Sequence, residues 1–136
     1  MTKDERLAEM VRYWWIKAQD SLSSARREFE AGSHAFAVNR LYYTLFYAVC
    51  AALLERKQTF KKHSGVRSAF HRQFIKTGLL DIKWGRLYDQ LFEDRQEGDY
   101  VVFISFEPEY VEHQLKQCEA FLEQLHNLLP SLGNPV

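Results

Sequence analysis

The chain contains little glycine, proline or cysteine. Its 136 residues include six Gly, three Pro and two Cys. So few helix-interrupting residues favour long helices with short connections. Cys50 and Cys118 both lie in apolar helical patterns, which excludes a disulfide framework, and we expect buried thiols.

The common enzymatic signatures are also missing. There is no glycine-rich phosphate loop, no His-Glu-x-x-His, no Gly-x-Ser-x-Gly and no metal-spaced Cys/His cluster. Since the histidines are scattered, we expect no metal site and no cofactor. No apolar run reaches membrane-spanning length and no signal peptide is visible, so we expect a cytoplasmic protein without a membrane partner.

What the chain does have is apolar material, 46% of all residues, with 15% aromatic. This suits one domain with one core, over residues 1–130, followed by a loose tail, 131–136. The aromatic surface is larger than a small bundle buries, which predicts a homodimer.

Apolar residues recur with a 3.6-residue period in five segments. We expect helices over 4–30, 34–56 and 64–75, with caps at Ser33 and Ser64 for the second and third. A fourth begins after a cap at Asp81, and a fifth runs from Pro108 to about 129. The β-prone residues 101–106 have no partner strand, so we expect a hydrophobic loop that packs down. These elements predict an all-α, five-helix up-and-down bundle.

The net charge is zero, but the charges are unevenly distributed. Residues 55–76 hold one acid, Glu55, and seven bases: Arg56, Lys57, Lys61, Lys62, Arg67, Arg72 and Lys76. Acids outnumber bases over 77–136. The basic segment either meets phosphates or is solvated or paired with acidic groups of this chain or a second subunit. The second interpretation is favoured, because like-charged surface segments are common.

Two arginines occur in apolar helical surroundings. Burying a guanidinium is costly unless something pairs with it, so Arg40 must reach solvent or an acceptor. Arg95 has Asp99 four residues on, the spacing of an ion pair on a helix. Either this pair is structural only, or Asp99 orients Arg95 toward a phosphate, which guanidinium recognises in a fork geometry.

Four motifs then occur in order: Asn39-Arg40-Leu41-Tyr42-Tyr43, Lys62-His63-Ser64-Gly65-Val66, Lys76-Thr77-Gly78-Leu79-Leu80 and Arg95-Gln96-Glu97-Gly98-Asp99-Tyr100. Together they resemble the HEPN domain family, over about residues 8–128, and its small stand-alone prokaryotic branch in particular. The resemblance implies an all-α bundle and frequent homodimerisation. It implies that many members are metal-independent ribonucleases, and that some are toxins whose antitoxin is a minimal nucleotidyltransferase encoded beside them.

The resemblance has one departure. Active nucleases of this family carry an arginine and, after four to six residues, a histidine, and two chains bring these motifs together. Arg95 matches the arginine, but the histidine position holds Tyr100, and no histidine occurs over 95–112. RNA cleavage by its own 2′-OH needs a base and an acid. Histidine, with a pKa of about 6.5, can be either, whereas tyrosine, near about 10, is a poor base. Whether the chain is an enzyme therefore stays open.

The resemblance implies catalytic roles for four residues. Arg95 and Asp99 would hold the phosphate, while Tyr100 and His63 would transfer protons. His63 can do so if the connection between the second and third helices folds over the site. The favoured interpretation of His63 is instead a structural hydrogen bond across a loop.

The other matching positions are candidates for contact with RNA or a nucleotide: Asn39, Arg40, Tyr43 and Lys62. For Arg40 and Tyr43, packing in the interior or in a dimer is the competing interpretation, and the one we favour.

The function expected from the resemblance is that of a toxin-like component of a HEPN/nucleotidyltransferase system acting on RNA. The alternative is a non-catalytic module that binds a nucleotide, RNA or the partner enzyme. A third interpretation is a purely structural dimer. The resemblance also suggests Tyr100 as a site of nucleotidyl addition by the partner.

Overall fold

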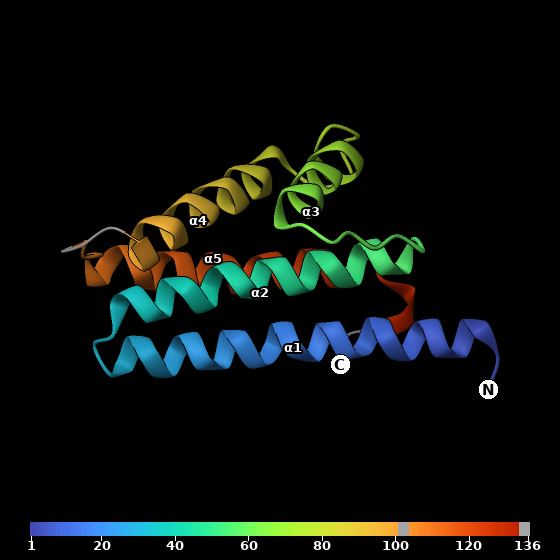
Figure 1. The fold of residues 1–136 in the computed structure, drawn as a ribbon, viewed down its shortest axis with the longest axis horizontal. Coiled ribbons are helices and arrows are strands. Elements are labelled where there is room, and N and C mark those ends of the chain that lie inside the picture. The colour runs from blue at the N-terminus through green and yellow to red at the C-terminus, as the bar shows by residue number, and fades with distance from the viewer. Residues whose placement is uncertain (101–103, 134–136) are drawn as a thin grey trace.

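Two long antiparallel helices form the base of the fold. The computed structural model describes residues 1–100 and 104–133. α1 (Lys3–Glu30) and α2 (His34–Glu55) run side by side in opposite directions (Figure 1). The Thr2 hydroxyl accepts a hydrogen bond from the backbone of Glu5, whose carboxylate accepts one from the backbone of Thr2. Gly32, at φ +79°, makes the turn between the helices.

α2 is the central helix, as its all-round apolar pattern predicts. It contacts α1, α3 (His63–Phe70), α4 (Ile82–Tyr100) and α5 (Pro108–His126). In length and mean hydropathy, 1.3 over its most apolar stretch, α2 could span a membrane, which corrects the expectation that no segment would. That stretch is 67% buried inside the fold, the pattern of a core helix.

The shorter helices lie over one side of α2 (Figure 1). α3 begins at His63 rather than after Ser64, and Lys62 occupies its N-cap position, so the predicted Ser64 cap is wrong. The expected helix continues to Ile75, but its last part, His71–Ile75, is the π-helix η1. Asp81 accepts a hydrogen bond from the backbone N–H of Lys83 at 2.9 Å, as a cap should.

The all-α expectation is confirmed: residues 1–100 and 104–133 contain five α-helices and no strand. Residues 104–107 are irregular and Phe106 packs against the core, while 101–103 lie outside the described residues. α5 ends at His126, before the expected 129, and Pro130–Leu132 form the 3₁₀ turn η2. Ser131 in this turn donates two hydrogen bonds to Glu55, so the start of the expected tail is tied to α2.

The cysteines are free thiols, as expected. Cys118 is fully buried on α5, and Cys50 is half-buried on α2. Ser33 occupies the N-cap position of α2, but its side chain makes no capping hydrogen bond.

Candidate functional site

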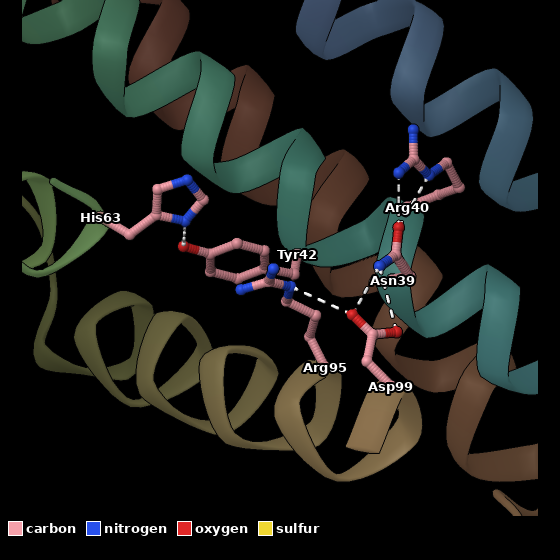
Figure 2. Close-up of polar contacts among 6 residues, drawn as sticks. All are labelled: Asn39, Arg40, Tyr42, His63, Arg95 and Asp99. Carbon is pink, nitrogen blue, oxygen red and sulfur yellow. Dashed lines mark hydrogen bonds and ion pairs between the residues drawn. The ribbon is translucent and has the colours of Figure 1, made fainter. Parts of the chain in front are cut away.

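Arg95 lies near the C-terminal end of α4 and turns its guanidinium toward α2 (Figure 2). The guanidinium carbon lies 5.2 Å from the ring centroids of both Tyr42 and Tyr43. The negative faces of these rings attract the cation. The side chain is 18% exposed, so the charge is held between two helices but remains reachable from solvent.

Asp99 neutralises Arg95 only in part. Its Oδ2 lies 3.4 Å from Arg95 Nε, and that nitrogen is buried without a hydrogen-bond partner. Both oxygens of Asp99 instead accept hydrogen bonds from Asn39 Nδ2, at 3.1 and 3.3 Å. The Asn39 Oδ1 in turn accepts from the guanidinium of Arg40. A chain of polar contacts therefore links Arg40 to Arg95 across α2 and α4 (Figure 2).

His63 contacts the same tyrosine, Tyr42, whose ring packs against Arg95. Its Nδ1 lies 2.9 Å from the Tyr42 hydroxyl, and its ring stacks on Phe46 with centroids 4.1 Å apart. These contacts hold the first residue of α3 against α2, and the helix starts two residues earlier than a cap at Ser64 predicts. Phe46 is a site residue that the sequence missed. The sequence pattern that could have indicated Phe46 is the run of aromatic residues on α2, which also contains Tyr42, Tyr43 and Tyr47.

Burial sets the protonation of this pair. Desolvation raises the pKa of Tyr42 to about 12, so its hydroxyl keeps its proton. Burial, and then the positive charge of Arg95, lower the pKa of His63 below 6.5, so the imidazole is neutral at pH 7. The 2.9 Å contact fits two tautomers of the neutral imidazole: the Tyr42 hydroxyl donates to an unprotonated Nδ1, or a protonated Nδ1 donates to the hydroxyl oxygen. In the first tautomer the proton lies on Nε2, which can donate to a phosphate oxygen, and in the second Nε2 is free to accept a proton.

The remaining predicted site residues divide into two groups. Tyr43 lies between two cations, because the Arg40 guanidinium carbon is also 5.2 Å from its ring centroid. Lys62 is exposed next to His63. Tyr100 ends α4 and is 76% exposed, with no hydrogen-bond partner in the described part of the chain. The structure brings together Asn39, Arg40, Tyr43, His63, Arg95 and Asp99, whereas Lys62 and Tyr100 stay at the surface.

The chemistry available here is that of cations, an amide, an imidazole and phenols. Within the described residues, no group of three or more His, Cys, Asp or Glu side chains could hold a metal ion. The arrangement suits an oxyanion: one guanidinium with spare charge, and an imidazole that contacts the same tyrosine, Tyr42.

Comparison with known proteins assigns this helical bundle to a family. A family model described as HEPN domain matches residues 11–128, and the chain belongs to the HEPN domain family. A UPF0332 protein of Thermotoga maritima is 39% identical over 124 residues, which are 91% of this chain and 94% of the relative. Two Methanocaldococcus jannaschii proteins carry the name putative toxin. MJ0142 is 36% identical over 115 residues, 85% of this chain and 78% of the relative, and MJ0605 is 30% identical over 115 residues, 85% of each.

Proposed function

We propose that this chain is the toxin-like member of a HEPN/nucleotidyltransferase pair and acts on RNA, with Arg95 holding a phosphate of the strand. The observation that carries the proposal is the incomplete neutralisation of Arg95. Its acid lies 3.4 Å away with both oxygens bonded to Asn39, while the Arg95 side chain stays 18% exposed. A phosphate would supply the missing charge. The toxin names of two relatives support the same proposal.

The chemistry proposed is transesterification without a metal. The 2′-oxygen of the ribose attacks the adjacent phosphorus, the bond to the 5′-oxygen breaks, and a cyclic phosphate and a 5′-hydroxyl result. Arg95 stabilises the negative charge that develops on the phosphorane. His63, neutral at pH 7, takes the 2′-OH proton in the tautomer that leaves Nε2 free, and Tyr100 supplies the proton to the leaving oxygen.

The family resemblance implies a homodimer, and an exposed apolar stripe on α1 supports one. Met10, Tyr13 and Ile16 are spaced three apart and are 51%, 59% and 53% exposed. Light scattering of the purified chain should give twice the monomer mass, and Ile16→Asp should reduce it to the monomer mass. A monomeric wild type would exclude a site shared between chains.

The decisive experiment is incubation of the purified chain with single-stranded RNA and a chelator. We expect fragments that end in cyclic phosphate, and their loss in Arg95→Met. Arg26→Met is the matched control, since Arg26 pairs with Glu119 on the surface, at 2.9 Å, away from the site. Uncut RNA with the wild type would refute the nuclease activity.

A second candidate function is RNA or nucleotide binding without cleavage. It is favoured by the tautomer in which the Tyr42 hydroxyl donates to His63 Nδ1, because a proton on Nε2 blocks that nitrogen as a base. Nitrogen-15 NMR of the His63 side chain in the RNA complex separates the two functions. A proton that stays on Nε2 supports binding alone, and a proton on Nδ1 supports cleavage.

The proposed partner is a minimal nucleotidyltransferase in the cytoplasm. Tyr100, 76% exposed at the end of α4, offers its hydroxyl to such an enzyme. The oxygen would attack the α-phosphorus of a nucleoside triphosphate, adding a nucleotidyl group and releasing pyrophosphate. Mass spectrometry of the co-expressed pair should find the added mass on the peptide with Tyr100 and not on the Tyr100→Phe protein. An unmodified Tyr100 counts against this role.

A further inference from the structure

The basic segment 55–76 is not absorbed by the Arg95 site. In the structure its second half forms an open pocket of about 440 Å³ on α3 and η1. Six side chains line this pocket, which we call the α3–η1 pocket: Ser64, Arg67, Ser68, His71, Arg72 and Lys76. All of them carry hydrogen-bond donors, and none is an acid. Such a lining favours an anionic ligand.

Arg67 is held in position by contacts with two residues outside the pocket. Its Nε donates to Asp89 Oδ1 at 2.8 Å, and its guanidinium carbon lies 4.5 Å from the ring centroid of Phe92. Both partners belong to α4. The terminal nitrogens of Arg67 have no hydrogen-bond partner within residues 1–100 and 104–133, and the side chain is 33% exposed. The guanidinium is thus held in place with its fork free to bind a phosphate.

His71 is held by the same carboxylate. Its Nε2 lies 2.9 Å from Asp89 Oδ1, and the π-helical turn carries the ring against α4. Gly85 makes this approach possible, because a Cβ at that position would lie 2.8 Å from His71 Cε1. One acid of α4 therefore holds two side chains that line the α3–η1 pocket, Arg67 and His71, which distinguishes the pocket from a set of freely moving surface lysines.

Asp89, which holds two side chains of the pocket, lies on the same helix as Arg95. Asp89, Phe92 and Arg95 are spaced three residues apart on α4, so they lie near one face. The six residues from Asp89 to Arg95 span about 9 Å of helix axis, or about two to three nucleotide steps of a stacked strand. Phe92 connects the two places: Arg67 lies over its ring, and Tyr42, beneath Arg95, packs edge-on against it with centroids 5.8 Å apart.

The basic segment is also largely unpaired. Of its seven Lys and Arg side chains, Arg67 alone forms an ion pair among the described residues. Apart from the pair of Arg67 with Asp89, the acidic part of the chain therefore does not neutralise the basic segment through ion pairs among the described residues.

We propose that the α3–η1 pocket binds further phosphates of the single-stranded RNA whose reactive phosphate Arg95 holds. Arg67 contacts the nearest of them, and Arg72 and Lys76 continue the path along η1. This inference rests on the proposed function, because it assigns the path of the same substrate.

The test compares two double variants that each remove two positive charges. Arg72→Ala/Lys76→Ala changes two exposed side chains of the pocket that form no hydrogen bond or ion pair with another helix among the described residues, so the variant should keep the fold. Arg27→Ala/Lys116→Ala removes the same charge from exposed positions on α1 and α5. The probe is a fluorescein-labelled single-stranded RNA, its binding followed by anisotropy between about 50 and 200 mM KCl. Cleavage of the same RNA is measured in parallel.

We expect the pocket variant to bind RNA several-fold more weakly. The slope of the logarithm of the binding constant against the logarithm of salt concentration should decrease in magnitude by about 1.4, since each lost phosphate contact contributes about 0.7 on a single strand. The control should match the wild type. If the pocket variant binds with unchanged affinity and salt slope while RNA is still cut, the inference is overturned and the proposed function stands. If the pocket contributes as expected but RNA stays uncut, the inference holds and the nuclease activity fails. A wild type that binds no RNA overturns both.

Discussion

Replacing Arg95 with methionine separates a functional arginine from a structural one. Methionine keeps most of the apolar stem and removes the charge. Two cation–π contacts are lost, about 1–2 kcal/mol together, and a partly exposed ion pair, about 0–1 kcal/mol. Against this, the buried Nε without a hydrogen-bond partner disappears, which recovers about 1–3 kcal/mol. The terms nearly cancel, so we expect the free energy of unfolding to change by no more than about 1 kcal/mol.

The assay is thermal unfolding followed by circular dichroism, with RNA cleavage and binding measured on the same preparation. For a chain of this size, about 1 kcal/mol corresponds to about 4 °C in Tm. We therefore expect a Tm within about 4 °C of the wild type together with loss of RNA cleavage and weaker binding. Arg26→Met should change neither property of the RNA interaction.

The reasoning is refuted by the opposite pattern. If Arg95→Met lowers Tm by more than about 10 °C and RNA handling by the folded fraction is unchanged, Arg95 is a structural residue. The pair with Asp99 would then be an internal ion pair with no ligand.

Three further outcomes follow from the same structure. Asp94 is 5% exposed and accepts a hydrogen bond from the Tyr110 hydroxyl, so Asp94→Ala should lower the free energy of unfolding in urea by about 1–3 kcal/mol, whereas Tyr110→Phe should lower it less. Because the pKa of His63 is lowered in the folded protein, the unfolded chain binds more protons below pH 6.5. The urea concentration at the unfolding midpoint should therefore fall as the pH is lowered from 6.5 through the folded-state pKa. This fall should be smaller in His63→Gln. Gly85→Ala should displace the His71 ring and weaken RNA binding. The free energy of unfolding should change little, because the helix propensity of alanine, about 1 kcal/mol better than that of glycine, offsets the displacement. An unchanged NMR chemical shift of the His71 ring would contradict this.

The helices could be predicted because each buries one side of a periodic sequence. In α1 a 3.6-residue period that starts at Leu7 predicts that Val11, Trp14, Ala18, Leu22 and Ala25 face the core, and all but Trp14 are buried. The neighbouring Trp15 is buried in place of Trp14. A one-residue shift turns a side chain by about 100° on a helix, and periodicity alone does not resolve it where both residues are apolar.

The polar site could be predicted only where it is local. The Arg95–Asp99 pair follows from a spacing of four on one helix. The contact between Asn39 and Asp99 joins residues 60 apart and depends on how α2 and α4 are placed along each other, which no local pattern encodes. For the same reason the basic segment was visible in the sequence, but the role of Asp89 in ordering Arg67 was not.

Tyr42 has a genetic consequence. It is completely buried, yet its ring carries Arg95 and its hydroxyl holds His63. If the chain is toxic, as proposed, a selection for alleles that relieve this toxicity would recover two kinds of Tyr42 change: those that lead to degradation of the protein and those that inactivate it. Alleles at Asp99, whose side chain is 31% exposed, should instead leave protein abundance intact, so an immunoblot of the survivors would sort the two kinds.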